Sequence, residues 1–238
     1  MRDLPMAQTA KAYILKINDP VSNDCAKVCS ESCDRVGLDW EYHHGYQNMT
    51  GKMAWTLTGL RTQYQEPVRY IPKPAPQHKA NACSAGHGAI WKRIAEGDDD
   101  VGILLEHDAI MLHYPSIEIP DGYIVTLGYK LKEPGRYDHE AAGPPTELID
   151  IDGHEGAHAY AMTRKTAQFL CLEIARRGVM GCVDNAYFIR GQRQTQVPLK
   201  IASPTPAMGW LRDSTIWAGG NSSVMNYKFI SSFAKNYK

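Results

Sequence analysis

The feature that most constrains the fold is an uninterrupted apolar run, Val-Gly-Ile-Leu-Leu at residues 101–105, that leads directly into Glu106, His107 and Asp108. A short apolar run without polar alternation is typical of a strand that is covered on both faces. Carboxylates avoid burial unless they are paired or bound to a metal, and ligands of open α/β sheets bind at the carboxyl ends of strands. Glu106 and Asp108, two residues apart on an extended segment, therefore predict a site for a hard divalent cation. The alternative is that both acids simply enter solvent where the strand ends.

A helix is predicted before this strand, over residues 78–95. Gly97 and the three aspartates at 98–100 end it in a surface turn. Its apolar positions recur at the spacing of one helical face, which should pack on a sheet: Ala82, Ala85, Ala89, Ile90 and Ile94.

Other segments repeat this alternation of strand and helix. Residues 12–17 predict a strand, and Asn18, Asp19 and Pro20 predict the start of a helix. Further strands are expected at residues 40–42 and 123–127. Another helix should follow a Thr163 cap and end at Gly178. Residues 43–77 and 130–155 show no strong periodicity and are predicted to be long loops.

Composition narrows the function classes. The chain has 238 residues, 43% of them apolar, which suffices for a proper core. The chain has 26 lysines and arginines and 26 aspartates and glutamates, so its formal net charge is zero. Its overall charge therefore gives no attraction to nucleic acid or to an anionic membrane. No apolar run is long enough for a transmembrane helix, and the first residues lack the apolar core of a signal peptide. A cytoplasmic protein is expected.

The six cysteines are expected to be reduced thiols. Cys25, Cys29 and Cys33 recur every four residues and should form one buried stripe of the helix that follows Pro20. A zinc site on this stripe is the alternative, but it would need a fourth ligand from elsewhere in the chain.

The sequence around the apolar run resembles a known family. The order Cys-Ser-Ala-Gly-His-Gly-Ala-Ile-Trp-Lys-Arg-Ile-Ala at residues 83–95, followed by Ile-Leu-Leu-Glu-His-Asp-Ala-Ile-Met at 103–111, resembles the family 25 glycosyltransferases, the lipopolysaccharide-type and collagen-galactosyl group. The resemblance covers about residues 11–217 and is most specific between 82 and 189. It departs from the family at Gly86, in place of a serine, and at His107, in place of an acid. An arginine that usually follows the Ile-Asn pair, here Ile17 and Asn18, is also missing.

The resemblance implies a single α/β domain of the GT-A type, a Rossmann-like, mostly parallel sheet with helices on both faces. Residues 11–128 would form the nucleotide-sugar and metal half, and residues 129–238 the acceptor half and C-terminal tail. The implied activity is transfer of a hexose from UDP-glucose or UDP-galactose, with inversion, assisted by Mn²⁺ or Mg²⁺ on Glu106 and Asp108. The resemblance places these residues at the donor: Ile17, Asn18, His87, Glu106, His107, Asp108 and His158.

An inverting transfer needs a carboxylate that accepts the proton of the acceptor hydroxyl. Asp184, in a Val-Asp-Asn segment similar to one in the family, is the first candidate, and Glu155 or Asp152 is the second. The expected acceptor is a glycan or another hydroxyl compound. A hydroxymethylated base in DNA is the alternative, because aromatic side chains in residues 43–77 suit a nucleobase as well as a sugar.

Two further readings are open. His154, Glu155 and His158 spell His-Glu-x-x-His, which on a helix would hold zinc as in a metalloprotease. The neighbouring glycines Gly153 and Gly156 argue against that helix. The replacement of an acid by His107 also allows a catalytically dead transferase-like fold that serves as a binding module.

Overall fold

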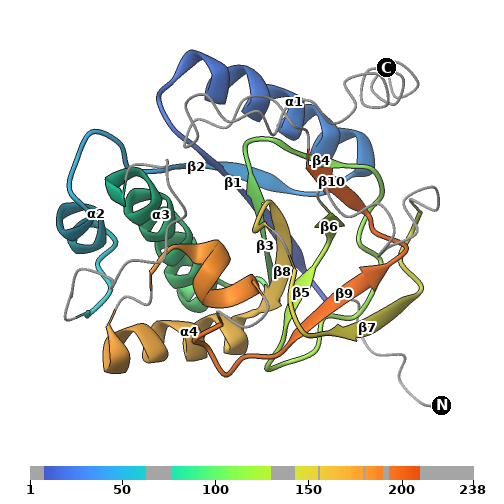
Figure 1. Cartoon of the computed structure of the whole chain (residues 1–238). Coiled ribbons are helices and arrows are strands. Elements are labelled where there is room, and N and C mark those ends of the chain that lie inside the picture. The colour runs from blue at the N-terminus through green and yellow to red at the C-terminus, as the bar shows by residue number, and fades with distance from the viewer. Residues whose placement is uncertain are drawn as a thin grey trace.

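The fold is built around one large sheet. The computed structural model describes residues 8–62, 77–129, 143–154, 156–178, 181–189 and 193–209. Seven strands form the main sheet in the order β2-β1-β3-β8-β5-β9-β7, and a smaller sheet has the order β4-β10-β6 (Figure 1). The strands are β1 (Ala10–Lys16), β2 (Trp40–His44), β3 (Val101–Glu106), β4 (Ala109–Met111), β5 (Ile124–Thr126), β6 (Gly128–Tyr129), β7 (Glu147–Ile151), β8 (Ala159–Thr163), β9 (Leu199–Ser203) and β10 (Ala207–Gly209).

Most strands of the main sheet run in one direction. β1 pairs in parallel with β2 and β3, and β5 pairs in parallel with β9. β8 lies antiparallel between β3 and β5, and β7 is antiparallel to β9 at the edge. The predicted α/β class with a mostly parallel sheet is confirmed.

The first strand and helix form as the sequence predicts. Asp19 is extended at φ −134° and its carboxylate accepts the backbone N–H groups of Val21 and Ser22, while Pro20 occupies the first turn of α1 (Pro20–Val36). Gly37, at φ 74°, ends the helix in the left-handed conformation that glycine adopts at little cost. This tight entry into α1 brings its N-terminus directly beside the end of β1.

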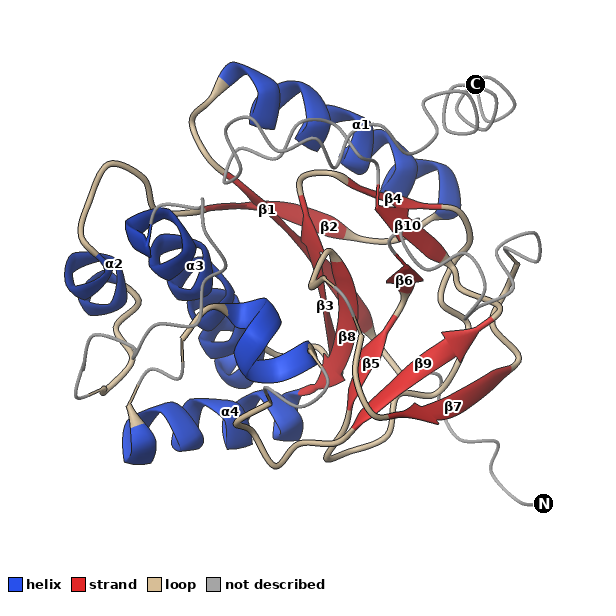
Figure 2. Ribbon diagram, in the orientation of Figure 1, coloured by secondary structure: helices blue, strands red, loops and turns tan. Residues whose placement is uncertain are grey.

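Helices cover both faces of the main sheet (Figure 2). One face packs on α1 and the small sheet, and the cysteine stripe of α1 is buried there, as predicted: Cys25, Cys29 and Cys33. The other face packs on α2 (Gly51–Leu57), α3 (Gln77–Glu96), α4 (Arg164–Arg177) and the π-helix η1 (Asp184–Phe188). α3 and α4 agree with the predicted helices at 78–95 and after Thr163, whose hydroxyl accepts the N–H of Thr166.

The prediction of one long loop over residues 43–77 is wrong in part, because α2 lies within it. Thr50 caps α2 by accepting the N–H of Met53, and Trp55 is 2% exposed against α3. A Cβ at Gly88 would lie only 2.6 Å from the Trp55 ring, so a glycine there lets the indole reach α3. The packing of Trp55 against α3 thus stabilises α2, a short helix that the local sequence periodicity does not predict. Residues 63–76 lie outside the described ones.

The second predicted loop, over residues 130–155, also contains regular structure. β7 pairs with β9 through a register that sets Ile149 opposite Ile201. As an edge strand it has no fully buried position and carries acids, which is why its sequence lacks a clear strand pattern. Residues 130–142 and Glu155 lie outside the described part of the chain.

Candidate functional site

A pocket of about 320 Å³ opens at the carboxyl ends of β1 and β3. β1 lies between β2 and β3, so the chain crosses to one side of β1 and then returns to its other side. Ligands of open α/β sheets bind at such a switch point. The pocket is lined by the end of β1 and start of α1, a loop at 45–49, the beginning of α3, and the turn after β3: Leu15, Lys16, Ile17, Asn18, Asp19, Gly45, Tyr46, Gln47, Asn48, Met49, Lys79, Ala82, Cys83, Glu106, His107 and Asp108.

The predicted acids reach this pocket, although not on an extended segment. Glu106 is the last residue of β3, and His107 and Asp108 form a turn that leads into β4. All three residues line the pocket. Because of this turn, Glu106, His107 and Asp108 all line the same cavity. On an extended strand, the His107 side chain would point to the face opposite that of both acids.

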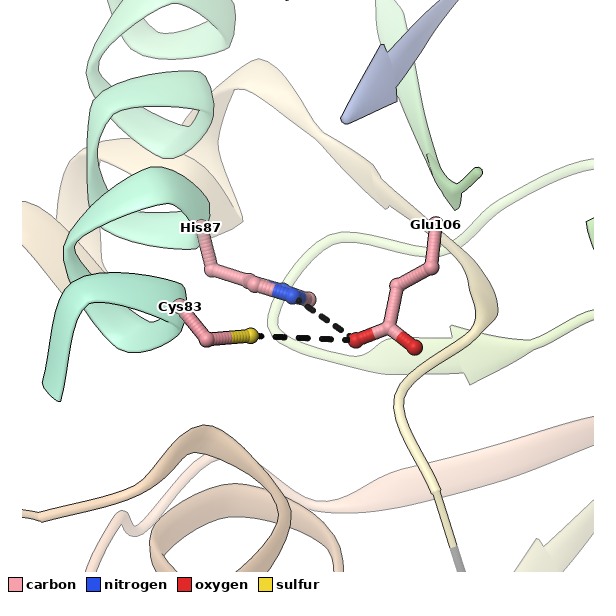
Figure 3. Close-up of side chains that lie close together, drawn as sticks. All are labelled: Cys83, His87 and Glu106. Atoms are coloured by element: carbon pink, nitrogen blue, oxygen red, sulfur yellow. Dashed lines mark hydrogen bonds and ion pairs between the residues drawn. The ribbon is translucent and has the colours of Figure 1, made fainter. Parts of the chain in front are cut away.

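The carboxylate of Glu106 faces two side chains of α3 (Figure 3). Its Oε1 lies 3.2 Å from Nε2 of His87 and 4.0 Å from Sγ of Cys83. Cys83 and His87 are four residues apart, so they project from the same face of the helix. His87 is fully buried and Glu106 is partly exposed, so the pair bridges the core and the pocket.

His87 is held from its other side by a buried hydrogen-bond chain. Its Nδ1 lies 2.8 Å from the hydroxyl of Tyr160 on β8, and that hydroxyl accepts the indole N–H of Trp91 at 2.8 Å. Burial raises the pKa of Tyr160 well above its usual value, so the phenol keeps its proton. The phenol O–H can then donate a hydrogen bond to Nδ1, which leaves Nε2–H to donate to Glu106. The chain Trp91–Tyr160–His87 thus fixes the position of the Glu106 carboxylate.

Positive charge and polar groups complete the pocket. Lys16 lies with Nζ 4.6 Å from the centroid of the Tyr42 ring, and Lys79 enters from the beginning of α3. Ile17 and Asn18, both predicted at the donor, line the pocket, and the Asn18 carbonyl accepts the side-chain amide of Gln47 at 3.4 Å. The lining therefore includes both acids and two lysines, as a site for an anionic ligand and a cation would.

Four predicted residues do not line this pocket: His87, which lies buried behind Glu106, Asp152, His158 and Asp184. His158 is 1% exposed, and its ring packs against the backbone of Gly128 and Gly209, where a Cβ atom would clash with it. Its backbone carbonyl accepts the N–H of Glu106 at 2.8 Å. Asp184 begins η1, which packs with Phe188 on Tyr160 and with Tyr187 on Trp91. Phe188 and Tyr187 thus pack η1 against the buried chain, and the roles of His158 and Asp184 at a donor or acceptor stay predictions.

The metalloprotease alternative lacks its helix. His154 and His158 lie in irregular chain before β8, with ring centroids 6.1 Å apart, and Nδ1 of His154 lies 3.1 Å from the carbonyl oxygen of Gly156. In the protease motif a helix sets both imidazoles on one face. That arrangement is absent from these described residues.

The sequence did not single out three members of the site. Cys83 and Tyr160 lie near His87, and Trp91 donates to the same hydroxyl as well as filling the core. The spacing of Cys83 and His87 was a usable signal, because residues four apart share one helix face. The approach of Tyr160 depends on β8 lying next to β3, which only the sheet order reveals.

No family model matches the chain, and no curated protein matches it. The family number therefore stays a prediction.

Among the described residues, no helix has the length and apolar character that crossing a membrane requires.

Similar solved structures are glycosyltransferases. An active-site mutant of LgtC is 9% identical, with a TM-score of 0.43 over 95% of each chain. GlyE of Streptococcus pneumoniae, in its apo form, is 9% identical with a TM-score of 0.42, over 97% of this chain and 64% of that one. A glycosyltransferase involved in glycosylation of the major capsid of PBCV-1 is 9% identical with a TM-score of 0.33, over 70% and 67%. Identities this low leave the activity to be argued from the chain's own residues.

Proposed function

We propose that this protein is a glycosyltransferase that moves a hexose from a nucleotide-sugar, UDP-glucose or UDP-galactose, to a hydroxyl acceptor with inversion. The observation that carries the proposal is the pocket at the switch point of the sheet, lined by Glu106, His107 and Asp108. The resemblance of residues 83–95 and 103–111 to family 25 supports the same activity.

The pocket suits the nucleoside diphosphate part of a nucleotide-sugar. Its volume of about 320 Å³ falls within the range of small-molecule sites. Lys16 and Lys79 can neutralise phosphate oxygens, and the N-terminus of α1 presents its positive dipole end at the same edge. The ring of Tyr46 offers an apolar face for a base or a sugar.

The side chains also fit a divalent cation. Carboxylate oxygens are the ligands that Mn²⁺ and Mg²⁺ prefer, and Glu106 and Asp108 bring two of them to the pocket with His107 between. When bound there, such an ion would neutralise charge on the leaving diphosphate. The chain Trp91–Tyr160–His87 supports this role, because a carboxylate held by a hydrogen bond keeps its orientation toward the ligand.

Inversion requires a base on the acceptor side. Asp184 is our first candidate and Glu155 or Asp152 the second, as the family resemblance implies. Asp184 is half-buried at the start of η1, next to the aromatic side chains that enclose Tyr160. We propose a glycan or other hydroxyl compound as the acceptor.

Release of UDP tests the proposal. The purified chain should release UDP from UDP-glucose or UDP-galactose in the presence of Mn²⁺, and a chelator should stop this release. A catalytically dead binding module would bind a UDP-sugar without releasing UDP. Absence of both binding and release would contradict the assignment of the pocket to a nucleotide-sugar.

A further inference from the structure

We propose that Cys83, His87 and Glu106 form a binding site for a first-row transition-metal ion such as Zn²⁺ or Co²⁺, which shares Glu106 with the proposed pair of Glu106 and Asp108. Sγ of Cys83, a ring nitrogen of His87 and a carboxylate oxygen of Glu106 all lie within 4.8 Å of one another. The three side chains converge from α3 and the end of β3 (Figure 3). This site does not depend on the proposed transferase activity.

The nitrogen–oxygen separation matches tetrahedral coordination, and the sulfur lies somewhat farther out. Typical zinc bond lengths, combined at a tetrahedral angle, separate a nitrogen and an oxygen ligand by about 3.3 Å and a sulfur and an oxygen ligand by about 3.6 Å. The observed separations are 3.2 Å for His87 Nε2 and Glu106 Oε1, and 4.0 Å for Cys83 Sγ and Glu106 Oε1. The sulfur and the His87 nitrogen lie within 4.8 Å of each other, so the Cys83 side chain must move toward the other two ligands to coordinate the same ion.

The fourth coordination position faces the pocket. Cys83 and Glu106 line the cavity, whereas His87 is fully buried behind them. Three protein ligands with one position open to a cavity is the arrangement of metal sites that also bind water or a small ligand. A closed structural site would instead require a fourth protein ligand.

The surroundings of His87 suit a metal ligand. When Nε2 binds a metal, Nδ1 carries the proton and must donate it. The Tyr160 hydroxyl lies 2.8 Å from Nδ1 and has two lone pairs, one of which accepts the N–H of Trp91. The second lone pair can accept Nδ1–H, so the same buried chain serves the metal-bound imidazole.

Ligand chemistry separates this site from the proposed Mn²⁺ or Mg²⁺ pair. A thiolate with an imidazole favours Zn²⁺ and Co²⁺, whereas carboxylates alone favour Mg²⁺ and Mn²⁺. Glu106 belongs to both sites: its Oε1 faces Cys83 and His87, and the other carboxylate oxygen points away from both side chains (Figure 3). Binding at the Cys83 site requires the thiolate, so the thiol proton leaves to solvent as the metal–sulfur bond forms.

Cobalt titration tests the site without any sugar. The chelator-treated chain should bind one equivalent of Co²⁺ and show thiolate-to-cobalt charge-transfer absorption with intense visible bands of a tetrahedral ion. Cys83→Ser should abolish the charge-transfer absorption and weaken Zn²⁺ binding by more than tenfold. The matched control is Cys171→Ser, which changes another half-buried cysteine, on α4, and should leave the spectrum unchanged.

A second variant covers the case in which Cys83→Ser does not fold. Tyr160→Phe keeps all three ligands and removes the hydroxyl that His87 Nδ1 and the Trp91 N–H share, so it should weaken Zn²⁺ binding by about 10–100-fold. A cobalt spectrum without sulfur absorption, or one unchanged in folded Cys83→Ser, would overturn the site. If the cobalt test fails but the chain still releases UDP with Mn²⁺, the metal site is wrong and the proposed transferase activity stands. If the spectrum depends on Cys83 but no UDP is released, the metal site stands and the transferase proposal is wrong.

Discussion

Nδ1 of His87 lies 2.8 Å from the hydroxyl of Tyr160, so a helix residue and a residue of the antiparallel strand β8 share a hydrogen bond in the core. The same hydroxyl accepts the indole N–H of Trp91. Tyr160 therefore joins the core of the sheet to Glu106 at the pocket.

Tyr160→Phe should destabilise the fold, because it leaves the buried Trp91 N–H without its acceptor and His87 Nδ1 without its partner. An unsatisfied buried polar group costs about 1–3 kcal/mol. Urea unfolding measures the loss. Tyr187→Phe, in the same buried cluster, is the control, since Trp91 and His87 keep their partner in it. Equal free energies of unfolding for wild type and Tyr160→Phe would show that the hydroxyl contributes nothing.

Local sequence patterns predicted the elements that carry the pocket. Asp19 and Pro20 mark the start of α1, and the apolar run at 101–105 marks a central strand, because capping and burial leave signals in a few adjacent residues. The meeting of Cys83 with Glu106 was not predictable in this way. It depends on how α3 packs on β3, which no local pattern encodes.

Edge and packing effects account for the missed elements. α2 is stabilised by the packing of the Trp55 ring against Gly88 of α3. β7 is stabilised by its backbone pairing with β9. In both cases a contact distant in sequence overrides weak local preference. Asp184 and His158 were placed by resemblance alone, and neither residue lines the pocket.

Acid should destabilise the protein through His43. Burial first, and then the nearby Arg93, lower the pKa of His43 to about 4, from about 6.5 in the unfolded chain. The unfolded state therefore binds the proton more readily, so stability present above pH 6.5 falls as the pH drops toward 4. Urea midpoints at pH 7 and pH 5 should differ more for wild type than for His43→Gln. The same acid sensitivity in both proteins would contradict this origin.

Asp184→Asn should lower turnover while donor affinity stays near that of wild type, if Asp184 is the base. Calorimetry with the UDP-sugar and a UDP-release assay separate the two quantities. A parallel loss of donor binding would instead make Asp184 a contact to the ribose, sugar or metal.

Binding of duplex DNA should be weak and nearly independent of salt, because the chain carries equal numbers of acidic and basic residues. Phosphate contacts lower log affinity by roughly 0.9 per contact for a tenfold rise in salt. A titration that gives sub-micromolar affinity at low salt and collapses at physiological salt would favour a modified DNA base over a glycan as the acceptor.

The most direct test of the account compares two carboxylates in Mn²⁺-dependent UDP release. Asp108→Asn removes one charge from the pocket without changing the shape of the side chain, whereas Asp98→Asn makes the same change in an exposed surface turn. We expect Asp108→Asn to abolish release with the unfolding midpoint unchanged, and Asp98→Asn to keep wild-type release. Full activity of Asp108→Asn with Mn²⁺ would contradict the proposed metal site at the centre of this account.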